Sequence, residues 1–462
     1  MLINLRYGLR ASRVLWTATP VILSLLRDWR RYFLWRNPRI LSETAHQRRA
    51  IKIRDKLESL GIVFIKVGQV LSTRGDLLPT IYLNELSKLQ DSVQPLPAML
   101  VQQTLEREYH RQLSEVFDEF EIKPLATASI GQVHRALHNG REVVVKFARP
   151  NILAQLERDC RTALLLLYVA ENLFRLLKIT ELDVFIRFYR IVISEIFQGM
   201  REETDLGHER QNAELMARTV ADMSELIIPK TVPELCTDHV LVLEYWSGTK
   251  VSHFHELEQQ GHSIRQIMQR LVTIYVRMIV SKGVYHADPH PGNIYIRPDG
   301  RIIIFDFGVV RTLSDETRRN LVQLGLAAVR KDIDGVIECL YKLGILLPSA
   351  DRAIARSTAE KFAALHFKGL ASKERFTEAA EAIYEEFKGF PLNLPQELVY
   401  VMRCLSLLEG LGSRYQPGWN LINEGYPAIR AAFAEYLVKS EGGWWNVMVS
   451  FIKGFIDFFK SN

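Results

Sequence analysis

The chain has 462 residues, a formal net charge of +6, and a composition that is 48% hydrophobic and 24% charged. Such a composition excludes a disordered or fibrous protein, and the length favours two or three packed units. The four cysteines lie far apart and form no C-x-x-C pair, which argues against a zinc site or a disulfide framework and predicts a reducing compartment.

Residues 1–42 are predicted to form a basic, aromatic helical segment. Several arginines precede an apolar run over residues 14–26, but no small-residue cleavage site follows, and the run is shorter than the roughly 20 residues that a spanning helix needs. A helix in the headgroup region of a membrane and a helix docked on its own protein both explain the segment. The hydrophobic tail over residues 441–462 leaves a similar choice between a membrane contact and a dimer helix.

Helical periodicity dominates residues 43–121, where apolar residues recur three and four positions apart. Residues 122–246 are predicted to form a lobe that contains a small sheet. Short β-branched runs at 143–145 and 240–243 predict strands, and the residues from 153 to 216 between them are helical in pattern.

Residues 247–440 predict a mainly helical second lobe. Ser263, followed three residues later by Gln266, is typical of a helix N-terminus, and that helix is expected to end at Gly283. Further along, Ile294–Ile296 and Ile302–Ile304 enclose a Pro-Asp-Gly turn, which predicts a β-hairpin.

A polar motif flanks each end of this predicted hairpin. Residues 286–293 read H-x-D-x-x-x-x-N, and residues 306–308 read D-F-G. Together and at this spacing, the two motifs are typical of a kinase-type site. We expect Asn293 and Asp306 to hold Mg²⁺, which prefers hard oxygen ligands, and Asp288 to orient or deprotonate the phosphoryl acceptor. The alternative is that these three side chains only cap the turns beside a hairpin.

A lysine paired with a helix glutamate would complete such a site. Lys146 directly follows the β-branched run at 143–145, where a kinase places the lysine that binds the α and β phosphates. The candidates for the helix glutamate are Glu202, Glu203, Asp205 and Glu209. On a continuous helix the first, third and fourth of these share one face, and the second is turned away. The alternative is a solvated acidic helix face.

The sequence lacks the glycine-rich phosphate loop of ordinary kinases. Residues 126–133, which read A-T-A-S-I-G-Q-V, stand in its place before Lys146. Side chains in such a loop hold backbone amides off the phosphates, so we expect the nucleotide to sit differently. Glu244, at the end of the second predicted strand, is expected to begin the hinge that binds adenine. The predicted nucleotide-contacting residues of the loop are Ala126, Ala128, Ser129, Gly131 and Gln132.

With these motifs the chain resembles the UbiB family of atypical kinases, also called the ABC1, AarF or ADCK family, over about residues 61–307. Three features carry the resemblance: a K-x-G-Q motif at Lys66–Gln69, the alanine-rich loop, and an E-x-D motif at Glu203–Asp205 followed by Glu209. The chain departs from the family at Arg210, where alanine is common.

The resemblance implies an α+β, protein-kinase-like two-lobed fold with an N-terminal helical extension that carries the K-x-G-Q motif. In the family this extension packs over the active site and excludes protein-sized substrates. It further implies that Lys66 meets Glu203 and that Glu209 meets Lys146. The residues expected to border the nucleotide on this basis are Lys66, Gln69, Glu203 and Asp205.

The resemblance also implies a function. Family members are membrane-associated, bind and hydrolyse nucleotide (ATP or ADP) with Mg²⁺, and support the biosynthesis of isoprenoid quinones such as ubiquinone, or of plastoquinone and related prenyl lipids. We therefore expect an ATP-dependent phosphotransferase or ATPase, peripheral or weakly anchored on the cytoplasmic side of a membrane. The alternatives are a small-molecule phosphotransferase and a non-catalytic, nucleotide-dependent lipid-binding scaffold. The expected partners are nucleotide, a membrane lipid or quinone precursor, and quinone-biosynthesis proteins or a second copy of the chain, but no nucleic acid.

Overall fold

The computed structural model divides the chain into two compact units. Unit 1 comprises Met1–Arg210 and Thr231–Tyr245, and unit 2 comprises Gln211–Lys230 and Trp246–Asn462. Helices and a β-sheet occur in both units, which confirms the predicted α+β class. The structure describes residues 12–14, 16–17, 42–72, 79–91, 95–127, 130–176, 190, 193, 197–202, 204–330, 332–367, 393, 395–416, 419, 421, 424–425, 427, 431 and 435–436.

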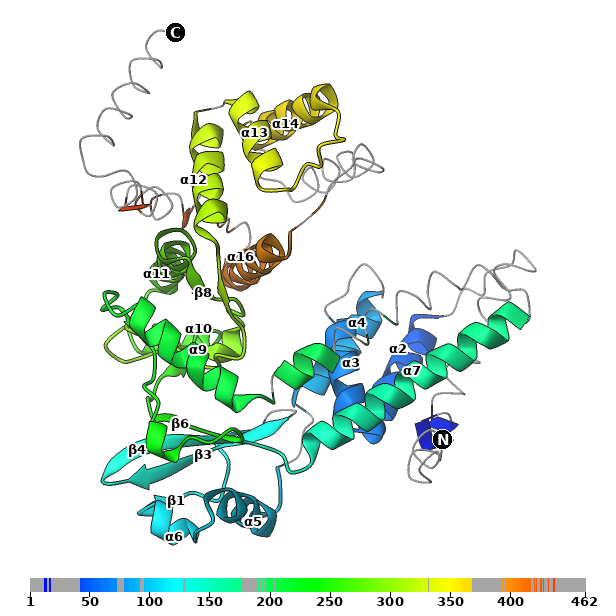
Figure 1. The fold of residues 1–462 in the computed structure, drawn as a ribbon, viewed down its shortest axis with the longest axis vertical. Coiled ribbons are helices and arrows are strands. Elements are labelled where there is room, and N and C mark those ends of the chain that lie inside the picture. Colours follow the sequence, from blue (N-terminus) through cyan, green and yellow to red (C-terminus); the bar gives the residue numbers. More distant parts are fainter. Residues whose placement is uncertain are drawn as a thin grey trace. The chain divides into compact units, whose positions relative to one another are not determined.

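The helices of unit 1 are α2 (Glu43–Leu60), α3 (Ile62–Ser72), α4 (Thr80–Ser87), η1 (Lys88–Asp91), α5 (Ala98–Tyr109), α6 (Leu113–Val116), α7 (Ile152–Leu176) and η3 (Pro233–Leu235), with the start of α9 (Leu206–Thr219). The first three pack against one another, and α7 packs against α3 (Figure 1). Apolar residues at helical spacing give these helices a shared core that includes Ile65, Leu86 and Leu89.

The sheet of unit 1 has the strand order β1-β3-β4-β6, with β2 paired to β3. Its strands are β1 (Glu119–Phe120), β2 (Ala126–Thr127), β3 (Gly131–His138), β4 (Arg141–Ala148) and β6 (Val240–Glu244). Asn139 and Gly140, with φ angles of 50° and 71°, join β3 to β4. Asn-Gly is the pair that two-residue hairpin turns favour when both residues need positive φ.

Side chains alternate between the two faces of β4. Val143 and Val145 enter a core formed with α5 and α6, which lie along one face of the sheet in Figure 1. Val144 points the other way and packs with Leu206, the first residue of α9. Because strand side chains alternate with a period of two, Lys146 lies on the face of Val144, toward α9.

Unit 2 contains a four-stranded sheet in the order β5-β10-β9-β7 and the two-stranded pair β11-β8. The strands are β5 (Leu226–Ile227), β7 (Thr249–Lys250), β8 (Val284–His286), β9 (Ile294–Ile296), β10 (Ile302–Ile304) and β11 (Val310–Thr312). Antiparallel pairing of β9 with β10 confirms the predicted hairpin. In its turn Gly300 has a φ of 81°, which a glycine adopts without strain.

The helices of unit 2 are the rest of α9, α10 (Phe254–Gln259), α11 (Ile264–Val276), the π-helix η4 (Arg277–Lys282), the 3₁₀-helix η5 (Pro291–Asn293), α12 (Asp315–Val329), α13 (Ile333–Lys342), α14 (Arg352–Phe367) and α16 (Gln396–Tyr415). The Ser263 hydroxyl accepts a hydrogen bond from the Gln266 amide, as predicted for the helix start. Gly283, with a φ of 72°, ends the helical run as expected. The core of this unit gathers buried residues from α11, α16 and the β9–β10 hairpin around Tyr275, Tyr285 and Phe307.

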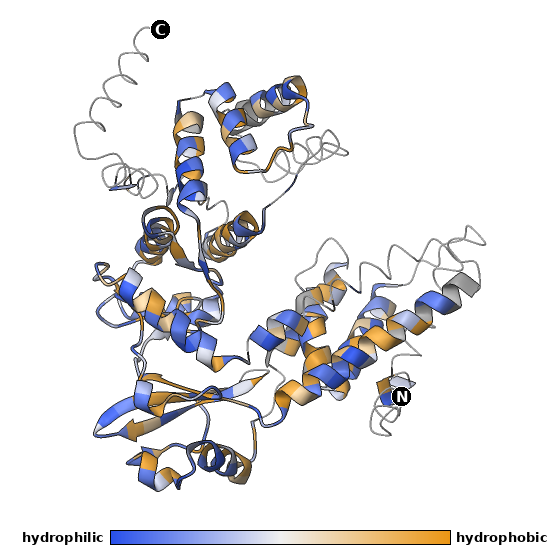
Figure 2. Ribbon diagram, in the orientation of Figure 1, coloured by the Kyte–Doolittle hydropathy of each residue, from blue (hydrophilic) through white to orange (hydrophobic). Residues whose placement is uncertain are grey.

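Within the described residues, no helix is both long enough and apolar enough to cross a membrane. Figure 2 illustrates this for α7, the longest described helix, along which hydrophilic and hydrophobic residues are interspersed. The tail at 441–462 and most of the basic segment at 1–42 lie outside the described residues, so their predicted membrane or dimer contacts stay predictions.

Candidate functional site

The predicted site residues divide between the two units, and the central feature of unit 1 is the pair of Lys146 and Glu209. Lys146 Nζ lies 2.7 Å and 2.8 Å from the two carboxylate oxygens of Glu209. The side chains are only 17% and 4% exposed. Lys146 reaches this partner because it lies on the face of β4 that packs against the first turn of α9. The predicted contact between the two residues is confirmed.

The acidic segment before α9 does not form the single helix that the sequence suggested. A helical stretch includes Arg201 and Glu202, the chain then turns, and α9 begins at Leu206. The prediction that Glu202, Asp205 and Glu209 share one helix face is therefore wrong. Asp205 instead caps α9, because its Oδ1 accepts a hydrogen bond of 2.9 Å from the His208 amide. Its predicted role beside the nucleotide stays a prediction.

The alanine-rich loop joins β2 to β3. Ala126 lies in β2, opposite Val133. Gly131 lies in β3 so close to β4 that an added Cβ would meet the Phe147 carbonyl oxygen at 2.5 Å. The fully buried Gln132 uses its side-chain carbonyl to accept a hydrogen bond from the Leu96 amide. These contacts fix the edges of the loop, whereas Ala128 and Ser129 at its tip lie outside the described residues.

The K-x-G-Q motif lies on α3, which packs against this loop. Val67 of the motif packs against a cluster that contains Ile130 of the loop. A Cβ at Gly68 would meet Leu89 Cδ1 at 2.3 Å, so leucine side chains pack closely against the helix at this glycine. The Gln69 side-chain amide donates from Nε2 to the Leu89 carbonyl at 3.1 Å. Glu203, the expected partner of the half-buried Lys66, lies outside the described residues.

The predicted hinge begins at the end of β6. Glu244 pairs with Val143 of β4, and the Tyr245 amide donates to the Glu142 carbonyl at 3.0 Å. That amide is therefore engaged in extending the sheet. The assignment of Glu244 to adenine binding stays a prediction.

In unit 2, hydrogen bonds bring Asp288, Asn293 and the D-F-G motif to one end of the β9–β10 hairpin. The side-chain amide of Asn293 donates from Nδ2 to the Asp288 carbonyl at 3.2 Å. The Phe305 amide donates to the Asn293 carbonyl at 2.8 Å, which places Asp306 next to Asn293 in the chain fold. The H-x-D-x-x-x-x-N and D-F-G motifs thus meet where the hairpin opens. His290 accepts a hydrogen bond at Nδ1 from the Gly292 backbone amide and caps η5.

Asp306 has an unusual backbone conformation. Its φ of 62° is in the left-handed region, which costs a residue with a side chain about 1–2 kcal/mol. Two contacts hold it there: its Oδ1 accepts from the Gly308 amide, and its carbonyl oxygen lies against Nε2 of the fully buried His286. Burial lowers the pKa of His286, which favours the neutral ring. A neutral ring that donates from Nε2 can accept at Nδ1, where the Tyr275 hydroxyl lies 3.5 Å away.

Two residues that the sequence reasoning missed contact these motifs. Asn212 of α9 donates from its side chain to the Phe307 carbonyl at 2.9 Å. Arg403 of α16 has a guanidinium nitrogen 3.5 Å from Asp288 Oδ1, although the two residues are 115 positions apart. Asn212 lies three residues after the singled-out Glu209, whereas no motif pointed to Arg403.

The donor set suits magnesium better than a transition metal. Among the described residues, no group of three or more His, Cys, Asp and Glu side chains could hold a metal ion. Mg²⁺ does not require such a cage, because it is commonly held by one or two protein oxygens together with substrate phosphates and water. The side-chain oxygens of Asn293 and Asp306 fit that description.

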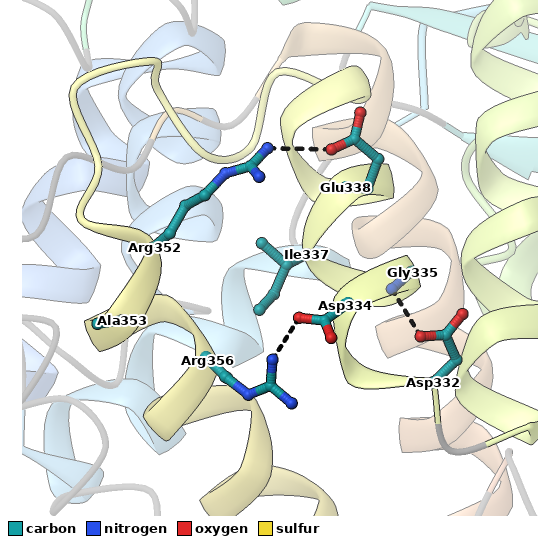
Figure 3. Close-up of a pocket in the computed structure, with 8 residues that line it drawn as sticks. All are labelled: Asp332, Asp334, Gly335, Ile337, Glu338, Arg352, Ala353 and Arg356. Carbon is teal, nitrogen blue, oxygen red and sulfur yellow. Dashed lines mark hydrogen bonds and ion pairs between the residues drawn. The ribbon is translucent and has the colours of Figure 1, made fainter.

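A cavity of about 560 Å³ lies elsewhere in unit 2, between α13 and α14. Figure 3 shows that its arginines already face carboxylates of the same cavity: Arg352 pairs with Glu338 at 3.1 Å and Arg356 with Asp334 at 2.6 Å. No predicted site residue lines it. The cavity therefore offers no unpaired cation for a phosphate.

The chain is similar to a known family and to several known proteins. The family described as "ABC1 atypical kinase-like domain" matches residues 88–340, which are more than half of the 462 residues. The chain is 31% identical over 431 residues to the protein named ACTIVITY OF BC1 COMPLEX KINASE 8, chloroplastic, of Arabidopsis thaliana, covering 85% of this chain and 56% of that relative. It is 32% identical over 390 residues to an uncharacterized protein of Synechocystis, covering 83% of this chain and 67% of that one.

A solved structure shows the same fold. The Mycobacterium tuberculosis protein Rv3197, solved in complex with erythromycin, aligns with a TM-score of 0.50 and 22% identity, covering 76% of this chain and 91% of that one. The predicted kinase-like fold is thereby confirmed. The chain spans only a little over half the length of the first Arabidopsis relative.

Proposed function

This chain belongs to the ABC1 family of atypical kinase-like proteins, and we propose on that premise that it binds Mg²⁺-ATP and acts as a phosphotransferase or ATPase. The observation that carries the proposal is the buried pair of Lys146 and Glu209, with both carboxylate oxygens within 2.8 Å of Nζ. A lysine held by a helix glutamate in this way is the part of a kinase site that binds the α and β phosphates.

Residues of unit 2 supply the metal ligands and the base in this proposal. Asn293 and Asp306 would hold Mg²⁺, which when bound neutralises charge on the β and γ phosphates. His286 keeps the Asp306 backbone in place. Asp288 accepts the proton of the attacking hydroxyl or water. Its backbone carbonyl accepts a hydrogen bond from the Asn293 side-chain amide, which holds Asp288 beside the metal ligands.

We further propose that this activity serves isoprenoid quinone or prenyl-lipid metabolism at a membrane. The support is family membership together with the K-x-G-Q helix, which packs against the alanine-rich loop. Two of the Arabidopsis relatives carry the word chloroplastic in their names, and plastoquinone-type lipids are therefore included in the proposal.

Steady-state ATP hydrolysis tests the enzymatic part of the proposal. The wild type should hydrolyse ATP only with Mg²⁺, with and without anionic liposomes, and Asp288→Asn should lower kcat by about a hundredfold because a general base is lost. Unchanged hydrolysis in this variant would remove Asp288 from the mechanism. The lipid part is tested by deleting the protein in its host: an unaltered pool of membrane quinones would contradict it.

A further inference from the structure

Arg403 places a cation beside the carboxylate expected to face the phosphoryl acceptor. Its Nη2 lies 3.5 Å from Asp288 Oδ1, and the two side chains are 53% and 28% exposed. Within the described part of the chain we find no second ion pair for Arg403. An arginine has five N–H donors, so most of its hydrogen-bonding capacity stays available after this contact.

The position of Arg403 is set by the packing of α16 rather than by the ion pair. The neighbouring Cys404 is fully buried, with its Sγ 3.9 Å from the His286 carbonyl. One turn earlier, the Tyr400 hydroxyl accepts from Arg311 of β11 at 3.1 Å. One turn later, Leu408 is buried in the core of the unit. α16 is thereby fixed against the H-x-D loop, and Arg403 is held at the edge of that loop.

The ion pair itself contributes little to folding. Half-exposed pairs at this distance are screened by water, and they lose in side-chain entropy much of what they gain in attraction. Arg403 can therefore readily leave Asp288 for an anion that binds a guanidinium more tightly. Phosphoryl groups are such anions, and the planar guanidinium fork matches them in a bidentate way.

We propose that Arg403 is a catalytic residue that binds the phosphoryl group during its transfer, on the acceptor side of the site. In ATP hydrolysis, the water oxygen forms a bond to Pγ while the bond between Pγ and the β–γ bridging oxygen breaks, and ADP leaves with that electron pair. Asp288 takes the proton from water and returns it to solvent. Arg403 exchanges its contact with Asp288 for the equatorial oxygens of the transferring group, which carry the charge of the transition state.

This inference rests on the proposed function, and the test separates the two. Three variants are compared with the wild type: Arg403→Gln, Arg403→Lys, and Arg414→Gln as the matched control. Arg414 is an exposed arginine on the same helix. Eleven residues are about three turns, so it lies on nearly the same face roughly 16 Å away. Measured for each are kcat of ATP hydrolysis, the Kd of Mg²⁺-ATP, and Tm.

Arg403→Gln should lower kcat by at least about tenfold, while the Kd of Mg²⁺-ATP stays within twofold of the wild-type value and Tm is unchanged. The reason is that the substitution removes a contact made only in the transition state. The kcat of Arg403→Lys should lie between those of the wild type and Arg403→Gln, because lysine keeps the charge but not the planar guanidinium. The kcat of Arg414→Gln should equal that of the wild type. A wild-type kcat in Arg403→Gln, or a raised one, would overturn the inference while leaving the proposed function intact. A wild type that binds no Mg²⁺-ATP would overturn the proposed function and the inference with it.

Discussion

The imidazole Nε2 of His286 lies within hydrogen-bonding distance of the Asp306 carbonyl oxygen, and both ends of this contact are held in place. His286 is the first residue of the H-x-D motif and is fully buried. Asp306 is the first residue of D-F-G and has positive φ. The contact therefore ties the loop of the proposed base to the backbone of the proposed metal ligand, 20 residues further along the chain.

The first prediction concerns this contact. His286→Leu should weaken the Kd for Mg²⁺ in the presence of ATP by about tenfold or more, because residues that support a metal ligand have effects of this size. Tyr275→Phe, which removes only the more distant hydroxyl, should have a smaller effect. Isothermal titration calorimetry with Mg²⁺ at a fixed ATP concentration measures the Mg²⁺ Kd of both variants. Equal Mg²⁺ affinity in His286→Leu and the wild type would show that the contact does not position Asp306.

The second prediction concerns the buried pair in unit 1. Lys146→Met and Glu209→Gln should each lower the free energy of unfolding by roughly 3 kcal/mol, because each removes one member of a buried ion pair. Combined, the two substitutions should cost less than the sum of the single effects. Chemical denaturation of all four proteins measures this coupling. Strict additivity would mean that the pair contributes nothing beyond its separate members.

Some of the fold follows from the sequence because local chemistry decides it. The Pro-Asp-Gly turn between two isoleucine runs specifies the β9–β10 hairpin, and the N-cap Ser263 specifies the start of α11. The Asn139–Gly140 turn between β3 and β4 carried an equally local signal, which the sequence reasoning overlooked. The pairing of Lys146 with Glu209 followed from a strand lysine and the family resemblance, although the residues are 63 positions apart.

Other features depend on tertiary packing that no local pattern encodes. The break before α9 makes Asp205 a helix cap, whereas spacing alone placed it on a helix face. Arg403 meets Asp288 only because the buried side of α16 packs under the H-x-D loop. No short motif surrounds Arg403 in the sequence, so its place beside the proposed base became visible only in the structure.

The third prediction is a pH dependence of stability that arises from His134. This residue is fully buried, its Nδ1 lies 2.9 Å from the Glu121 carbonyl, and its ring stacks on Phe120 at 5.3 Å. Burial lowers the pKa of His134 in the folded protein. Below a pH of about 6.5 the unfolded chain binds a proton at this histidine that the folded chain does not bind. The free energy of unfolding should therefore decrease by up to about 1.4 kcal/mol for each unit by which the pH is lowered.

Denaturation curves between pH 8 and pH 5 for His134→Gln test this pH dependence. The variant should lose that part of the pH dependence, whereas His239→Gln, at an exposed position in the same unit, should keep it. If His134→Gln and the wild type lose stability in parallel as the pH falls, another group is responsible.

The fourth prediction concerns two glycines in different surroundings. Gly131→Ala should destabilise the protein by about 1–3 kcal/mol, because the new Cβ would meet the Phe147 carbonyl, which is backbone and cannot swing away. Gly410→Ala in α16 meets nothing within 4 Å and should be neutral or stabilising by up to about 1 kcal/mol through helix propensity. Thermal melting of both variants decides this. A stable Gly131→Ala would mean that β3 and β4 can separate at this point.

The central claim is that the D-F-G aspartate holds Mg²⁺ for a bound nucleotide, and a binding titration tests it most directly. The Kd of ATP is measured with Mg²⁺ and with EDTA for the wild type, Asp306→Asn and Asp299→Asn. Asp299 is the control because it lies in the turn of the same hairpin and its carboxylate contacts Arg301. We expect Mg²⁺-dependent binding in the wild type and in Asp299→Asn, and an ATP affinity at least about tenfold lower in Asp306→Asn. Equal ATP affinity with Mg²⁺ and with EDTA, or wild-type affinity in Asp306→Asn, would contradict it.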